Sequence, residues 1–164
     1  MEQSSKKSNY IELAELAYLA YFSVMLGAKA LGLYEGQFAY NICLVVGAAL
    51  FGVKILLTNH SVVEYFFMVL LLALGVVVYL NSEEKSLLIF ITMMLGMKGV
   101  SIKRVFKVGV CIWTAVFVAM YVLSVVGVIP ELAYTLDRNG WPPILRHSLG
   151  YPHPNSLHIS YVIF

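Results

Sequence analysis

One stretch of this sequence, residues 145–156, gathers side chains that can do chemistry. It reads Leu-Arg-His-Ser-Leu-Gly-Tyr-Pro-His-Pro-Asn-Ser. Arg146 is a permanent cation, and its planar donors can bind two oxygens of a phosphate at once. His153 titrates near neutral pH, so its neutral imidazole can accept a proton from an attacking hydroxyl. At the level of a membrane surface, these two groups suit chemistry on a substrate with a lipid tail and a diphosphate head.

The backbone around the histidine is predicted to be stiff and extended. Pro152 and Pro154 fix their own φ angles, offer no N–H and restrict the residues before them, so His153 is not expected on a helix. Asn155 is a good helix-capping type at the start of a new apolar run. A plainer interpretation is that Arg146 pairs with lipid headgroups and that the prolines only interrupt regular structure before the next helix. Spacing alone does not choose between the two.

The composition indicates an integral membrane protein of the all-α class. Of the residues, 60% are hydrophobic and only 12% are charged, and the mean hydropathy is +0.83; soluble domains contain about twice that charged fraction. No short apolar segment is followed by a small-residue cleavage site, so no signal peptide is predicted. Cys43 and Cys111 fall in apolar segments and are expected to be packing residues, with no disulfide, metal or cofactor implied. Small residues from Gly47 to Gly52 can allow close helix contact, or can be filler.

The chain is predicted to form one transmembrane domain over residues 1–164. Crossing a bilayer as a helix takes about 20 residues, and the segments that reach or approach this length are 12–33, 38–57, 62–80, 86–100 and 108–129. The segment 86–100 is the short one, at about 22 Å of helix, and needs snorkelling or local thinning of the bilayer to span. A sixth segment starts at Leu157 and the sequence stops eight residues later. We therefore expect the N-terminal part of a larger membrane protein.

Charge placement predicts the orientation. If every segment crosses and the N-terminus is cytoplasmic, the inner flanks carry most of the basic residues: Lys6, Lys7, Lys54, Lys98, Lys103, Arg104 and Lys107, against Lys29, Lys85, Arg138 and Arg146 outside. This follows the positive-inside rule and places the long connection 130–156 outside the cytoplasmic membrane. If 86–100 did not cross, that loop would face the cytoplasm. The basic passage 98–107 is expected at the inner interface, in contact with anionic lipid.

The remaining charged residues are predicted to be interfacial. Glu12 and Glu15 share a helical face near a helix start, where the helix dipole favours carboxylates. Glu64 is interpreted as a first-turn acid and His60 as a loop residue. The sequence contains no metal-binding spacing of His and Cys. No strands are expected, so no phosphate-binding loop after a strand is expected either, and nothing supports nucleic-acid binding.

The residues from Arg146 to Asn155, after five spans and an outer loop, resemble the signature of bacterial polysaccharide polymerases. These are the Wzy-type enzymes of capsule and exopolysaccharide loci, related to O-antigen polymerases and ligases. The matched features are the Arg, the Ser-Leu-Gly, the His-Pro-Asn and the helix start that follows. The basic passage Lys98-Gly-Val-Ser-Ile-Lys-Arg104 is also similar to a cytoplasmic loop of such proteins. Only about ten residues carry the resemblance specifically, although the layout agrees throughout.

The resemblance implies a metal-independent enzyme that polymerises undecaprenyl-diphosphate-linked oligosaccharide repeat units at the outer face. Arg146 would stabilise the diphosphate leaving group, and His153 would orient or deprotonate the acceptor hydroxyl. The substrate-binding residues implied are Arg138, His147, Tyr151 and Asn155. Expected partners are the lipid-linked oligosaccharide, membrane lipids, and flippase and chain-length regulator proteins. The family has about twice as many spans, with further basic residues in a later outer loop.

Two other functions stay open at this point. The chain can be a truncated, non-catalytic remnant or an accessory subunit of a polysaccharide export system. It can also be a transporter of lipid-linked sugar, although such proteins usually carry ionisable residues in mid-membrane. Here the predicted spans are nearly free of charge between their ends, with Lys29 the nearest exception.

Overall fold

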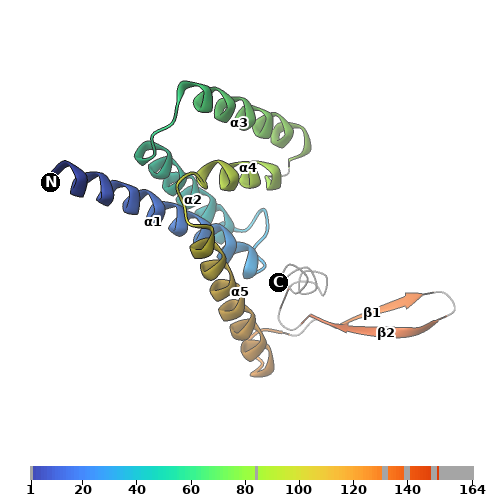
Figure 1. Ribbon diagram of the computed structural model, residues 1–164. Coiled ribbons are helices and arrows are strands. Elements are labelled where there is room, and N and C mark those ends of the chain that lie inside the picture. Colours follow the sequence, from blue (N-terminus) through green and yellow to red (C-terminus); the bar gives the residue numbers. More distant parts are fainter. Residues whose placement is uncertain (1, 84, 131–132, 139–140, 149–150, 152–164) are drawn as a thin grey trace. The chain divides into compact units, whose positions relative to one another are not determined.

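The computed structural model describes residues 2–83, 85–130, 133–138, 141–148 and 151 (Figure 1). The helices within these ranges are α1 (Glu2–Ala30), α2 (Phe38–Leu57), α3 (Val62–Ser82), α4 (Ser86–Gly96) and α5 (Ile102–Val125). They are followed by strands β1 (Ala133–Arg138) and β2 (Trp141–His147). The predicted helical membrane bundle is confirmed, and the strands add a feature that the sequence reasoning did not expect.

Four of the helices are long and apolar enough to cross a membrane. The apolar stretches are Ile11–Ala30, Phe38–Leu57, Val62–Ser82 and Ile102–Val125. Large apolar side chains on α3 and α5 face outward, as lipid-facing helices require. Helix α4 has only 11 residues, which is about 16 Å. These findings agree with the predicted multi-pass membrane protein.

Six helix boundaries differ from those expected, at both ends of α1 and α5 and at the ends of α3 and α4. Helix α1 begins at Glu2 and α5 at Ile102, earlier than the expected starts at 12 and 108. Both extensions contain Lys, Glu or Arg. These residues are good helix formers, but they are charged and so do not continue an apolar run. Helix α4 ends at Gly96, before the expected end at 100, because a turn follows in which Gly99 has φ 72°.

The expectation of no strands was wrong for the connection after α5. Strands β1 and β2 form an antiparallel pair, with Tyr134 opposite Arg146 and Arg138 opposite Trp141. The dipeptide Asn139-Gly140 lies between them in the sequence, and Asn-Gly is a strong signal for a tight hairpin turn. The two prolines of β2 lie where the pairing is irregular, opposite the register shift between Leu136 and Arg138, and such irregularities tolerate residues without an N–H.

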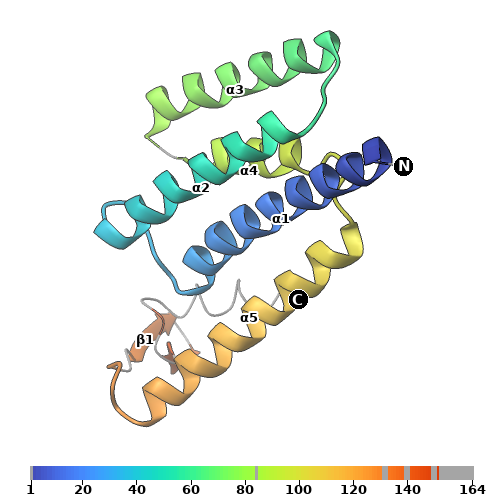
Figure 2. The same ribbon diagram turned by 90° about the vertical axis from the view of Figure 1, so that its left-hand side faces the viewer.

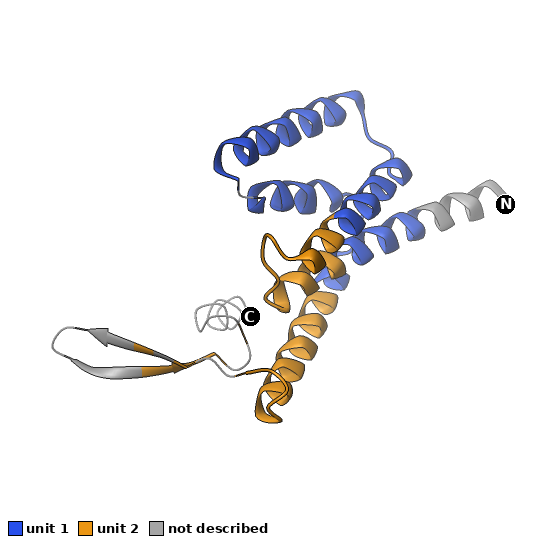
Figure 3. Ribbon diagram, turned by 180° about the vertical axis from the view of Figure 1, so that it is seen from behind, with its two compact units in different colours: residues 1–22, 45–105 blue, residues 23–44, 106–164 orange. Residues whose placement is uncertain are grey.

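The described chain divides into two compact units, coloured separately in Figure 3. Unit 1 comprises residues 1–22 and 45–105, and unit 2 comprises 23–44 and 106–164. In unit 1, polar contacts join α1 to α4. The Tyr18 hydroxyl donates to the backbone oxygen of Met93 at 3.0 Å, and the hydroxyls of Tyr21 and Thr92 lie 2.7 Å apart. These bonds satisfy polar atoms that lipid cannot.

Helices α3 and α4 of unit 1 lie side by side (Figures 1 and 2). They touch at Gly75, where a Cβ would lie 3.0 Å from a methyl carbon of Leu88 and 3.1 Å from one of Ile91. By contrast, no heavy atom lies within 4 Å of a Cβ placed at Gly52. A close helix approach therefore occurs at Gly75, whereas Gly52 of the small-residue stretch in α2 does not provide one.

Unit 2 contains two helix ends of the same kind. At the end of α1, Gly32 has φ 71° and the Leu33 N–H bonds back to the Ala28 oxygen at 3.0 Å. At the end of α5, Gly127 has φ 80° and the Val128 N–H bonds back to the Leu123 oxygen at 2.9 Å. This is the Schellman pattern, in which a left-handed glycine lets the last carbonyls find donors.

Candidate functional site

Arg146 and His147 lie at the end of β2. Arg146 is half-buried and His147 is exposed, and their backbones pair with Tyr134 and Ala133. The predicted cation thus sits on a paired strand whose partners fix its backbone. Of the two groups expected to do chemistry, only Arg146 falls among the described residues. His153 lies outside them, as does Asn155, so the pairing of Arg146 with His153 stays a prediction.

Arg138 and Arg146 are not neighbours in the hairpin. Arg138 is opposite Trp141, at one end of the paired region, whereas Arg146 is opposite Tyr134, at the other. The two pairs are four residue steps apart along β1 and five along β2. A strand rises about 3.4 Å per residue, so the two arginine backbones are roughly 14–17 Å apart along the strands. The described backbone therefore does not bring Arg138 beside Arg146.

Tyr151 is buried, although it was expected to line a substrate site. Its side chain is among the largest fully buried ones, and the neighbouring Ser148 is buried too. The Tyr151 N–H donates to the Ser148 oxygen at 3.0 Å. Among the described residues, the Tyr151 hydroxyl has no hydrogen-bond partner. Burial raises the pKa of this phenol because the low-dielectric surroundings disfavour the phenolate.

A second group of polar residues gathers at one end of unit 1. The Lys98 ammonium lies 2.8 and 2.6 Å from the two carboxylate oxygens of Glu64 and donates to the backbone oxygen of Asn59 at 2.9 Å. Glu64 also completes a capping box at the start of α3, where its carboxylate accepts from the Ser61 N–H at 2.7 Å. The C-terminal end of α4 is thereby held against the N-terminal end of α3.

Helices α1, α2 and α5 contribute to the same end of unit 1. The Lys54 side chain of α2, 2% exposed, donates to the backbone oxygen of Lys98 at 2.8 Å. The Glu15 carboxylate of α1 accepts from the Ser101 N–H at 3.0 Å and from Arg104 at 2.8 Å. The turn between α4 and α5 is thus held by Glu15 of α1, Lys54 of α2 and Glu64 of α3. We call Glu15, Lys54, Glu64, Lys98 and Arg104 the ionic cluster.

His60 lies next to the ionic cluster. Its side chain is 3% exposed, and its Nδ1 is 3.8 Å from a Glu64 oxygen, while its ring meets Tyr65 edge-on with centroids 5.4 Å apart. Among the described residues, its Nε2 has no hydrogen-bond partner. Burial lowers the pKa of His60, and the nearby Lys98 lowers it further. The expectation of a simple loop residue was therefore incomplete, because the imidazole is packed inside the protein.

A pocket of about 360 Å³ opens beside His60, between the first turns of α3 and the last turn of α4. Its walls are mostly apolar, and the polar groups of the ionic cluster stand at one end. The lining residues are His60, Val63, Glu64, Phe67, Met68, Met94, Leu95 and Lys98. This volume and this mixture of apolar walls with a few polar groups are typical of a small-ligand site.

The sequence reasoning missed the ionic cluster, although a signal for it was present. Glu15, Lys54, Glu64 and Lys98 were each placed near the cytoplasmic ends of predicted spans, but were interpreted singly as interfacial charges. Opposite charges at the same depth in a helix bundle can pair, and a buried charge needs such a partner. Sequence alone does not reveal which acid meets which base.

The described part of the chain shows no group of three or more His, Cys, Asp or Glu residues that could hold a metal ion. Cys43 is half-buried, Cys111 is exposed, and both are free thiols.

Comparison of the chain with protein-family models, with curated proteins and with solved structures gives no match.

Proposed function

We propose that this protein acts in bacterial surface-polysaccharide synthesis, joining undecaprenyl-diphosphate-linked repeat units at the outer face of the cytoplasmic membrane. In this reaction a growing glycan leaves one lipid diphosphate and is transferred to a hydroxyl of the next repeat unit. The proposal rests on the Arg146–Asn155 motif, which follows several membrane spans and resembles that of Wzy-type polymerases. Arg146 would stabilise the diphosphate leaving group, and His153 would serve the acceptor hydroxyl.

The placement of Arg146 supports this role. The side chain is half-buried, and its backbone is held by pairing with Tyr134, so a bound phosphate would meet a cation on a fixed strand. A positioned cation stabilises developing negative charge better than a mobile one, because less reorganisation is needed during the reaction. Arg138, at the other end of the hairpin, would need a different part of the substrate to contact.

The ionic cluster supports the orientation that the proposal needs. It gathers the start of α3, the end of α4 and the start of α5 at one end of unit 1. Helix α4 therefore returns the chain to the side from which α3 began, and α5 starts again from that side. If α5 crosses the membrane from that side, the connection after it would lie on the opposite side, as an externally acting site requires.

The test is to substitute Arg146→Ala and His153→Ala separately in the gene at its native locus and to measure the length distribution of the cell-surface polysaccharide. Loss of long chains in both variants is expected, with the protein still present in the membrane. Lys85→Gln removes a cation outside the motif, on the side predicted to be external, and should leave chain length unchanged. Normal chain length in both motif variants would overturn the proposed roles.

A further inference from the structure

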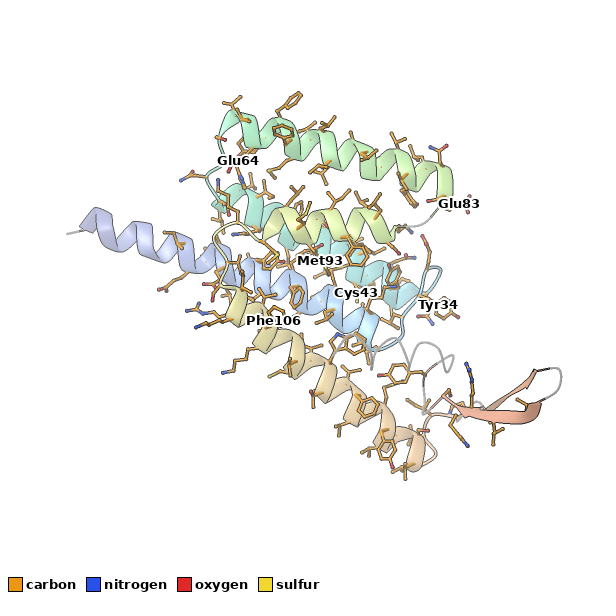
Figure 4. All side chains as sticks on the ribbon, turned by 45° about the vertical axis from the view of Figure 1, so that its right-hand side comes forward. Tyr34, Cys43, Glu64, Glu83, Met93 and Phe106 are labelled. Carbon is orange, nitrogen blue, oxygen red and sulfur yellow. The ribbon has the colours of Figure 1, made fainter. Side chains whose placement is uncertain are left out.

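Helices α3 and α4 meet closely at Gly75, and the pocket in unit 1 lies nearer the start of α3. At Gly75 the helices are in contact through Leu88 and Ile91. Nearer the start of α3, the exposed side chains of Phe67 and Met94 line the pocket. Figure 4 shows Glu64 at this end of α3 and Met93 on α4.

The walls of the pocket suit a hydrocarbon chain. Val63, Phe67 and Met94 are 63%, 54% and 58% exposed, and they belong to a region where other outward side chains of α3 are also apolar. A water molecule is stable in a cavity only when it has two to four polar partners, which these walls do not offer. Inside a bilayer, an acyl chain can fill the same space at no cost in hydrogen bonds.

The polar end of the pocket carries a positive field. Lys98 stands there with its side chain 41% exposed, and the buried Lys54 lies behind it, hydrogen-bonded to the Lys98 backbone. The ionic cluster holds three basic side chains against the two carboxylates of Glu15 and Glu64, so its net charge is positive. This charge attracts the anionic headgroup of a lipid, even though Lys98 is already paired with Glu64.

We propose that the pocket binds an anionic phospholipid from the leaflet at the ionic-cluster end, with one acyl chain along Phe67 and Met94 and the headgroup phosphate beside Lys98. The lipid would fill the space that α4 leaves beside α3 and would add a counter-charge to the ionic cluster. This site is separate from the Arg146–Asn155 motif, and it does not depend on the function proposed above.

The experiment is lipid retention by the full chain, purified in detergent, delipidated and titrated with dioleoyl phosphatidylglycerol or dioleoyl phosphatidylcholine. The intact mass of the protein reports how many lipids stay bound. We expect one phosphatidylglycerol per chain, held about fivefold more tightly than phosphatidylcholine, which is the effect of one lysine near a headgroup. Equal retention of the two lipids by the native sequence would overturn the anionic preference.

Two pairs of variants locate the site. Met94→Trp fills the pocket and should abolish retention of phosphatidylglycerol, whereas Val77→Trp, on an exposed position of α3 outside the pocket, should not. Lys98→Gln should remove the preference for the anionic lipid, whereas Lys85→Gln, at the other end of α4, should keep it. Because Lys98 also holds the α4–α5 turn, this variant can fail to fold. In that case the two tryptophan variants test the proposal alone. Equal loss of phosphatidylglycerol retention in Met94→Trp and Val77→Trp contradicts the proposed pocket.

Discussion

Glu15 of α1 and Arg104 of α5 form an ion pair, with 2.8 Å between Oε2 and Nη1, although 89 positions separate them in the sequence. The other Glu15 oxygen accepts from the Ser101 N–H at 3.0 Å. The first N–H groups of a helix lack partners within it, and the helix dipole favours negative charge there. The first turn of α5 contains no acidic residue. Glu15 therefore supplies, from another helix, the charge that α5 does not supply itself.

Replacing Glu15→Ala should destabilise the protein, because it removes an acceptor from Ser101 and leaves Arg104 without this partner. We expect the free energy of unfolding in detergent micelles to fall by about 1–3 kcal/mol, as for the loss of a partly buried, charged hydrogen-bond partner. The matched control is Glu12→Ala, one turn earlier on α1 and exposed, with an expected change of at most about 0.5 kcal/mol. Equal losses in the two variants would show that Glu15 has no special role.

Gly96→Ala should also destabilise unit 1. A Cβ at this position would lie 2.7 Å from ring carbons Cδ2 and Cε2 of Tyr18, and Tyr18 cannot withdraw without losing its bond to Met93. Overpacking of this kind costs about 1–3 kcal/mol. Gly52→Ala is the control, because no heavy atom lies near its Cβ position, and it should be neutral or raise the melting temperature slightly. Thermal unfolding of both variants in the same detergent decides the matter.

The membrane spans were predictable because hydrocarbon imposes one strong requirement, a run of apolar residues long enough to cross. Helices α2 and α3 begin where the sequence predicts, at Phe38 and Val62. The hairpin was missed because its strands are short and β2 contains two prolines, so only Asn139-Gly140 marks it. The start of α1 at Glu2 was missed because the apolar pattern begins about ten residues after the helix does.

The candidate sites were predictable in part. The types and spacing of Arg146 and its neighbours single out the motif, but the pairing register that separates Arg138 from Arg146 depends on the turn geometry. The burial of Tyr151 and His60 depends on tertiary packing, which leaves no periodic trace in a loop. The ionic cluster joins residues from separate helices, such as Glu64 and Lys98, and sequence distance does not encode such contacts.

His60 should make stability depend on pH. Burial lowers its pKa in the folded protein, so the unfolded chain binds a proton more readily, and stability should rise with pH across the interval between the two pKa values. Above the unfolded value of about 6.5 the full stability is present, and below it stability should fall, by at most about 1.4 kcal/mol per pH unit. His60→Gln should flatten the melting temperature between pH 5 and 8.

The ionic cluster predicts which connections share a side of the membrane. The contact of Lys98 with Glu64 and that of Ser101 with Glu15 place the α2–α3 and α4–α5 connections together, opposite the end of α3. With both native cysteines replaced by alanine, Asn59→Cys and Lys103→Cys should react with an impermeant thiol reagent from the same side. Ser82→Cys should react from the other side.

Thr135→Cys extends this measurement to the hairpin, where Thr135 is exposed on β1. Because α5 is long enough to cross a membrane and starts at the side of the ionic cluster, Thr135→Cys should react from the same side as Ser82→Cys. In intact cells the proposed external site requires both to be labelled without permeabilisation, and Asn59→Cys only after it. If Thr135→Cys is labelled together with Asn59→Cys instead, α5 does not carry the chain to the opposite side of the membrane. Arg146 would then face the cytoplasm, and an external polymerase site on this hairpin would be ruled out.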